Sequence, residues 1–252
     1  MSNIQWNAGD YRKNFSFVPS YGASVIELLT KPAGSFVVDL GCGSGALTEK
    51  LAQKGYEVLG IDDSDAMLAL ARQEYPALTF RKGNAVRYTL ERKADAIFSN
   101  AVLHWIDAEE QQSMLNNLFE QIVPGGELVC EMGGYGCAEH VHSTLEQCFA
   151  GRGLVYRRTF YFPTIGQYAP MLERAGFQVN YAILFDRPTV QNGADGLADW
   201  IRMFNMEPFR GIDASTQDAI IREAAERLRD KLWQDGHWIV DYVRLRFRAK
   251  RP

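Results

Sequence analysis

Residues 36–52, FVVDLGCGSGALTEKLA, decide the fold of this chain. The apolar run FVV is typical of a buried strand in a parallel sheet, and a helical pattern begins near Ala46. Between them lie Gly41, Gly43 and Gly45. Glycines permit positive φ angles and let a ligand lie against the backbone, and the start of the following helix offers unpaired N–H groups. The stretch therefore predicts a nucleotide-type pocket where the strand passes into the helix.

The glycine spacing alone leaves two ligand classes open. Gly41, Gly43 and Ala46 also satisfy the GxGxxG/A pattern of dinucleotide-binding proteins, so an oxidoreductase is one alternative. Asp39 favours the other class. A carboxylate at the end of the strand would repel a pyrophosphate but attract a ligand that carries an ammonium or sulfonium group.

A second acidic strand end follows in YEVLGIDDSDAML, where Asp62 lies about twenty residues past the first glycine. In sites of this topology such a carboxylate accepts hydrogen bonds from the ribose hydroxyls. Together these motifs resemble the class I S-adenosylmethionine-dependent methyltransferases, which share a DxGxGxG loop, an acidic residue closing the second strand and a GDA triplet after the third. Here the triplet is Gly83, Asn84 and Ala85, with asparagine in place of aspartate. Its amide can still accept a hydrogen bond from an adenine amino group.

The resemblance implies an α/β fold: a Rossmann-like, seven-stranded, mostly parallel sheet in the order 3-2-1-4-5-7-6, with the last strand antiparallel and helices on both faces. It also implies S-adenosylmethionine as the cofactor, with Asp39 near its amine and Met67 against its adenine. The full set of expected cofactor contacts is Tyr11, Asp39, Gly41, Cys42, Gly43, Asp62, Asp63, Met67, Asn84, Ala85, Asn100 and Ala101.

Residues for the methyl acceptor are expected after the fourth strand, DAIFSNAVLHW, and after the fifth. Both positions lie at the end of the sheet where open α/β folds bind ligands. His104 is a candidate base or hydrogen-bond donor, and Tyr135 a second catalytic candidate. Trp105 and Trp200 join these two as candidate acceptor contacts, although aromatic residues at helical spacing also suit a core.

Segments outside the motifs are similar to the trans-aconitate methyltransferase group: WNAGDYRKNFSFVPSYG near the start, then FDRPT, DWIRMF and DGHWIVDYVRLRF. Juvenile hormone acid methyltransferases share the LHW ending of strand four. Both groups methylate carboxylates, so the resemblance implies methyl ester formation on a small molecule. A phenol, amine or carbon acceptor stays open, as does a module that only binds the cofactor.

Length and composition are those of one enzyme domain spanning residues 1–252, with cofactor-covering helices over about 1–30. The net charge of −4 argues against a nucleic-acid partner, and strand four ends in SNAV rather than a base-clamping NPPY. No apolar run reaches the ~18 residues that a membrane span needs, and no signal peptide is visible, so we expect a cytoplasmic protein. The four cysteines indicate reduced thiols. The oligomeric state stays open.

Alternating patterns predict the individual elements. Helices are expected over 19–30, 45–54, 65–74 and 107–122, and strands over 36–40, 56–61, 78–81, 95–99, 126–131, 177–185 and 237–249. Capping boxes are expected at Asp107 with Glu110 and at Thr164 with Gln167. Residues 195–234 read as helical and are expected to form a lid over the acceptor pocket, inserted between the last two strands.

Two further patterns favour ordinary structural roles. His140 and His142 point to different faces of a helix and have no third ligand at a recognised spacing, so no metal is expected. Arg244, Arg246 and Arg248 alternate with apolar residues along the last strand. Period-two alternation predicts one buried face and one face in water, and places these arginines in water.

Overall fold

A computed structural model describes residues 18–252 of the chain. The first half alternates strand and helix. Its elements are α2 (Val18–Ile26), β1 (Phe36–Leu40), α3 (Ala46–Gln53), β2 (Glu57–Asp62), α4 (Asp65–Glu74), β3 (Thr79–Lys82), β4 (Ala94–Asn100), η1 (Leu103–Trp105), η2 (Ala108–Glu110), α5 (Gln111–Gln121) and β5 (Ile122–Gly133). Those of the second half are α6 (Glu139–Ala150), α7 (Ile165–Arg174), β6 (Gln178–Asp186), β7 (Thr189–Gln191), α8 (Gly196–Phe204), η3 (Glu207–Phe209), α9 (Ala214–Leu232), β8 (Trp233–Gln234), β9 (His237–Val240) and β10 (Val243–Lys250).

The main sheet has seven strands in the order β3-β2-β1-β4-β5-β10-β6. β10 pairs antiparallel with both β5 and β6, while β1 to β5 pair in parallel. This confirms the predicted fold class and strand order, with β10 as the seventh strand. Consecutive residues of β1 face opposite sides: Val37 packs with α2 and α3, and Val38 packs with α5 and α7. The sheet therefore has a covered apolar core on both faces.

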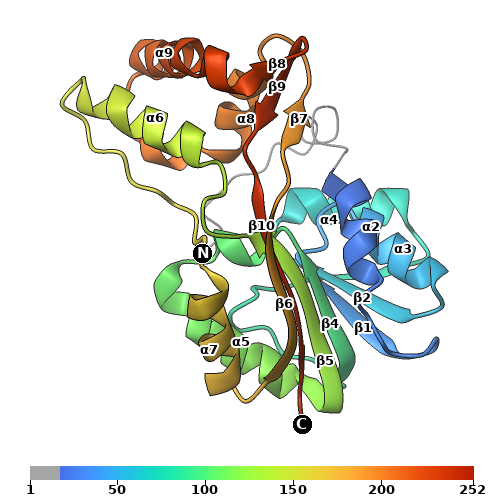
Figure 1. The fold of residues 1–252 in the computed structure, drawn as a ribbon. Helices are drawn as coiled ribbons and strands as arrows, with labels where there is room; N and C mark the ends of the chain where they lie inside the picture. Colours follow the sequence, from blue (N-terminus) through green and yellow to red (C-terminus); the bar gives the residue numbers. More distant parts are fainter. Residues whose placement is uncertain (1–17) are drawn as a thin grey trace.

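A second layer, which we call the lid, consists of α6, α8, η3, α9 and a small sheet in the order β7-β9-β8. Figure 1 shows it above the carboxyl ends of the parallel strands. Its own core joins Val141, Leu145 and Phe149 of α6 to Ile221 and Leu228 of α9. Residues 195–234 are helical for the most part, as expected, but the lid also contains α6 and the small sheet, which the sequence patterns did not indicate.

The predicted strand over 237–249 is two strands. The chain leaves the lid sheet after Val240 and enters the main sheet at Val243, with Asp241 and Tyr242 between them. Trp238, Val240 and Tyr242 are buried in the lid core, whereas Leu245, Phe247 and Ala249 are buried against the main sheet, so the phase of the alternation shifts by one residue between the two strands.

The two predicted capping boxes have different outcomes. Thr164 and Gln167 form a complete capping box at the start of α7. The box expected from Asp107 and Glu110 is wrong: a 3-10 turn precedes α5 there, and neither side chain makes a capping hydrogen bond. The turn shifts the first residue of the helix to Gln111, whose amide instead donates to the carbonyls of Leu103 and Ile106.

None of the helices within residues 18–252 is long and apolar enough to cross a membrane. All four cysteines are buried free thiols.

Candidate functional site

The glycine loop between β1 and α3 adopts a backbone that only glycine tolerates well. Gly41, Gly43 and Gly45 have φ angles of 75°, 54° and 85°. A Cβ atom on Gly41 would lie 2.1 Å from a methyl group of Val102. The N–H groups of Gly41 and Cys42 both donate to the carbonyl of Ile61, at 2.7 and 3.0 Å, which ties the loop to β2. The loop is thus held open at the carboxyl ends of β1, β2 and β4.

Asp39 is buried at the end of β1, where Thr48 donates a hydrogen bond of 2.6 Å to its carboxyl group. Burial raises the pKa of Asp39 to about 7, with the charge of Asp62 adding to the rise and the Thr48 hydroxyl opposing it. The carboxyl group of Asp39 therefore titrates much closer to neutral pH than an ordinary aspartate. A cationic group beside it would favour the ionised form.

Asp62 braces the glycine loop from the end of β2. One carboxylate oxygen accepts from the N–H of Gly43 at 2.9 Å, and the other from the N–H of Ser64 at 2.8 Å. Burial raises the pKa of Asp62, and these backbone hydrogen bonds oppose the rise. Each oxygen keeps a further lone pair, so the carboxylate can still accept hydrogen bonds from ribose hydroxyls.

The ends of β2 and β3 meet beside Asp62. Asn84 donates a long 3.4 Å hydrogen bond to Asp63, and its amide oxygen accepts from the N–H of Val86 at 3.0 Å. Met67 is buried, with its methyl group 3.2 Å from the position of a Cβ on Gly43. Ala85 is half-buried against the core. The expected adenine-side residues therefore lie together, and the Asn84 amide is partly occupied by its own loop.

Asn100 and Ala101, at the end of β4, carry two signs of a ligand site. The Asn100 side chain is buried and its Oδ1 atom has no hydrogen-bond partner. Ala101 has a φ angle of 60°, in the left-handed region that alanine rarely adopts, and its carbonyl accepts from the indole of Trp105. An unpaired buried acceptor beside the glycine loop fits a cofactor that brings an ammonium donor.

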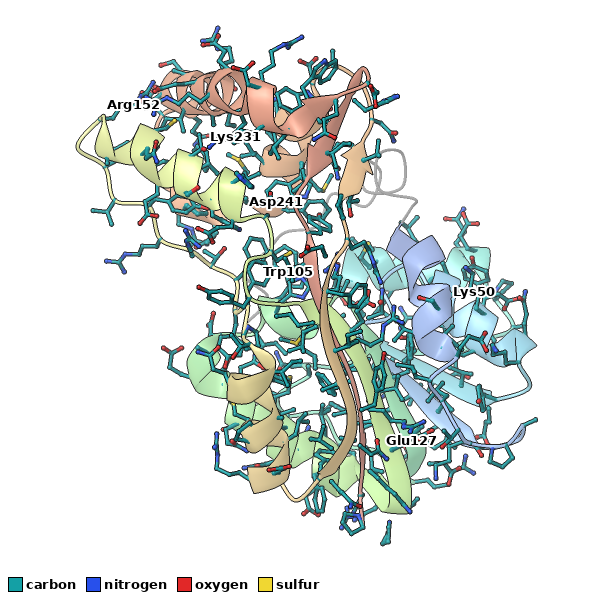
Figure 2. All side chains as sticks on the ribbon, viewed as in Figure 1. Lys50, Trp105, Glu127, Arg152, Lys231 and Asp241 are labelled. Atoms are coloured by element: carbon teal, nitrogen blue, oxygen red, sulfur yellow. The ribbon has the colours of Figure 1, made fainter. Side chains whose placement is uncertain are left out.

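A cavity lies between this strand end and the lid. The cavity is open to solvent, and the empty space in it and at its mouth amounts to about 520 Å³. Its lining residues are Ala101, His104, Trp105, Cys137, Ala138, Phe160, Phe162, Trp200, Phe204, Tyr242 and Arg244. Figure 2 shows Trp105 between the sheet and the lid. Ala101 and Ala138, which has a φ angle of 55°, are two of the three non-glycine residues of the described chain with positive φ. Backbone strain thus gathers at this cavity.

His104 presents a hydrogen-bond donor to the cavity. Its Nδ1 atom accepts from the N–H of Gly133 at 3.2 Å. Burial and then the charge of Arg244 hold the pKa of His104 well below its usual range, so the ring is neutral. A neutral imidazole whose Nδ1 accepts must carry its proton on Nε2. This tautomer suits a donor to an anion and is a poor proton acceptor.

Arg244 corrects the prediction that the arginines of the last strand lie in water. The side chain is only 9% exposed, lines the cavity and has no hydrogen-bond partner at Nε, while its guanidinium lies 4.6 Å from the Tyr242 ring centroid. Arg246 is also largely buried, because Glu131 of β5 lies opposite it. The lid and helix α2 cover a strand face that alternation alone assigns to solvent.

Only some of the other residues expected to contact the acceptor line the cavity. Trp105 and Trp200 line the cavity, whereas the side chain of Tyr135 is 65% exposed and is not among the lining residues. Tyr11 lies outside the described residues. Cys42 packs against Leu68 and Phe80, so its contribution to the loop is its backbone. His140 bonds Asp241, and His142 bonds Tyr156 inside the lid. Within residues 18–252, no three His, Cys, Asp or Glu side chains are grouped to hold a metal ion.

Sequence reasoning missed Arg244 and the aromatic residues Phe160, Phe162 and Tyr242. One signal was present for Phe160 and Phe162, which stand two apart in FYF and stack with centroids 5.1 Å apart. For Arg244 the signal was its position as the second residue of the last strand, which begins at the ligand-binding end of the sheet.

Cofactor affinity is expected to depend on pH through Asp39. Below pH 7 the free protein holds a proton on this carboxyl group, which must leave before the group can pair with an ammonium ion. Affinity for S-adenosylhomocysteine should therefore rise on the order of tenfold from pH 5.5 to pH 7, a range below the titration of the ligand's own α-amino group. Calorimetric titration measures this rise, and Asp39→Asn should flatten it. A rise of equal size in the variant would exclude Asp39 as its source.

Known proteins resemble both the motifs and the whole chain. A methyltransferase domain family matches residues 37–126. A trans-aconitate 2-methyltransferase of Variovorax paradoxus is 30% identical over 82% of this chain and 82% of its own length. An uncharacterized methyltransferase of Schizosaccharomyces pombe is 29% identical over the full length of both. Among solved structures, a putative methyltransferase from Bacillus halodurans superposes with a TM-score of 0.65 at 15% identity, covering 92% of this chain and 99% of that one.

Proposed function

The chain belongs to the class I S-adenosylmethionine-dependent methyltransferases, and from this premise we propose that it methylates a carboxylate oxygen of a small molecule, which forms a methyl ester. The observation that carries the proposal is the buried guanidinium of Arg244, which lines the cavity with an unpartnered Nε atom. No carboxylate within residues 18–252 forms an ion pair with this guanidinium, and a buried cation in that position favours an anionic ligand. The Variovorax relative, a trans-aconitate 2-methyltransferase, supports the same acceptor class.

The cofactor supplies an electrophilic methyl group on sulfur when it is bound. We propose that Asp39 and Asn100 bind its ammonium group, that Asp62 binds its ribose, and that Met67 and Asn84 contact its adenine. The unpaired buried oxygen of Asn100 fits such a ligand.

A carboxylate acceptor also agrees with the state of His104. Carboxylic acids are ionised at pH 7, so no base is required. A phenol or an ammonium ion would have to lose a proton, and Nε2 of His104 already carries one in the tautomer that the Gly133 N–H imposes. In our proposal, Arg244 and the Nε2–H of His104 hold the carboxylate while the apolar walls exclude water from its reacting oxygen.

The test compares one acid with its isosteric amide, alcohol and primary amine, each incubated with the purified chain and S-adenosylmethionine. We expect S-adenosylhomocysteine release only with the acid, together with a product that mild base converts back to the acid. Release with the alcohol or amine in place of the acid would contradict the proposal. Tight cofactor binding with no release from any acceptor would favour a module that only binds the cofactor.

His104→Ala is expected to lower kcat about 10- to 100-fold, the worth of one hydrogen bond to a charged group, while the cofactor Kd changes less than about twofold. Asp62→Ala should do the reverse and raise the cofactor Kd by about 10- to 100-fold, because it removes the ribose acceptor and the brace on Gly43. Calorimetry and a methyl-transfer assay separate the two effects. Turnover that His104→Ala leaves unchanged would remove His104 from the mechanism.

The pH profile of the wild-type enzyme tests whether His104 stays neutral over the working pH range. With saturating cofactor, kcat is expected to be flat between pH 6 and pH 8, because neither the neutral imidazole nor the acceptor carboxylate titrates there. A fall in kcat centred near pH 6.5 that disappears in His104→Ala would instead identify the histidine as a general base.

A further inference from the structure

The charged and apolar residues of the cavity wall bear on the part of the acceptor that lies beyond its reacting carboxylate. Among the lining residues that the structure describes, Arg244 is the one charged side chain, and the neutral His104 lies beside it. Six of the remaining residues are aromatic: Trp105, Phe160, Phe162, Trp200, Phe204 and Tyr242. The wall thus offers one anchor for a carboxylate and a large apolar surface.

The next arginines along the sheet are already paired. Arg187 donates two hydrogen bonds to Glu131, and Arg246 donates two more to the same carboxylate. Neither residue lines the cavity. On the lid side, Arg158 donates two hydrogen bonds to Glu139. A second carboxylate in this cavity would therefore be desolvated without a cation among the described wall residues.

The indole N–H groups of the cavity wall already donate hydrogen bonds within the protein. The indole N–H of Trp200 donates to the hydroxyl of Tyr242 at 2.5 Å, and that of Trp105 donates to the carbonyl of Ala101 at 3.2 Å. Trp105 and Phe160 lie 4.5 Å apart, and Phe160 and Phe162 stack within 6° of parallel. The rings therefore face the cavity as apolar surfaces that suit a flat hydrocarbon.

We propose that the acceptor is an acid with one carboxylate on an apolar, flat or unsaturated body, and that the enzyme discriminates against polycarboxylic acids. This inference rests on the proposed function and narrows it. It separates the chain from relatives named for trans-aconitate, a compound with three carboxylates. Specificity then comes from the lack of a second cation in the described wall, because a second buried anion would have no partner among those residues.

The experiment compares trans-cinnamate and sorbate with trans-aconitate on the full chain at saturating S-adenosylmethionine. We expect kcat/KM for at least one of the monocarboxylates to exceed that for trans-aconitate by 100-fold or more. Binding to the complex with S-adenosylhomocysteine, followed by tryptophan fluorescence, should rank the acids in the same order. Faster methylation or tighter binding of trans-aconitate overturns the inference but leaves the proposed function intact.

A charge variant tests the cause of the selectivity. Phe204→Arg adds a second cation to the wall and is expected to raise the ratio of trans-aconitate to cinnamate in kcat/KM at least tenfold. Phe204→Leu, which opens the same space without a charge, should not raise it. Equal ratios in the two variants contradict the charge argument. If no acid binds or is methylated while an alcohol or amine is, the proposed function itself fails.

Discussion

Arg244→Met is expected to lower kcat/KM for a carboxylate acceptor by about 10²- to 10³-fold, because removing one partner of a buried charge pair costs about 2–5 kcal/mol. Methionine keeps much of the length and apolar volume of the side chain, so the loss reports the charge. The guanidinium is buried beside His104, so little water screens its attraction for a carboxylate. Steady-state methyl transfer with varied acid measures the loss, and cofactor Kd should stay within about twofold.

Two further variants make this result specific. Arg248→Met changes the same residue type at the other end of the same strand. Arg248 donates a hydrogen bond to Asn180 and does not line the cavity, so this variant should leave kcat/KM within about twofold. Arg244→Lys keeps the charge but not the planar fork, so its loss should be intermediate. Equal losses in Arg244→Met and Arg248→Met would show that general destabilisation, rather than acceptor binding, explains the effect.

Glu131→Gln is expected to reduce the free energy of unfolding by about 3–5 kcal/mol. The Glu131 side chain is 3% exposed and holds both Arg187 and Arg246. The substitution preserves shape but removes the negative charge that two largely buried guanidinium groups share, and Arg246 also links this group to Ser24 of α2. Urea unfolding of the cofactor-free protein at pH 7 measures the change as a shift of the midpoint at constant slope.

The matched control is Glu57→Gln. Glu57 also pairs with an arginine, Arg92, but both side chains are 60% exposed, and an exposed pair contributes about 0–1 kcal/mol. The two variants remove the same charge from the same residue type and differ in burial. If Glu131→Gln were no more destabilising than Glu57→Gln, the buried group would not be a stabilising centre of the sheet.

The sheet, and the places in it of the residues that we propose bind the cofactor, were predictable because their sequence signals are local. A short apolar run indicates a buried strand. The glycines at 41, 43 and 45 indicate a loop that needs positive φ at these positions. Asp39 and Asp62 stand at strand ends, and parallel strands bring those ends to one edge. The relative positions of these residues therefore follow from the topology alone.

The acceptor half was less predictable because it depends on contacts between distant segments. Alternation along β10 shows which residues share a face, but not that Glu131 and the lid cover that face over Arg244 and Arg246. Tyr135 illustrates the converse, since it follows the fifth strand yet its side chain is exposed. Only the packing of α6, α8 and α9 over the sheet decides which of these side chains meets a ligand.

The most direct test of the account follows the methyl group itself. Single-turnover incubation of the wild-type chain with methyl-labelled S-adenosylmethionine and an apolar monocarboxylic acid should place the label in a methyl ester, which mild alkali releases as methanol, and Arg244→Met should abolish most of that ester under the same conditions. Label in a base-stable product, or an equal yield of ester from the Arg244 variant, would contradict the claim that this cavity holds a carboxylate for methylation.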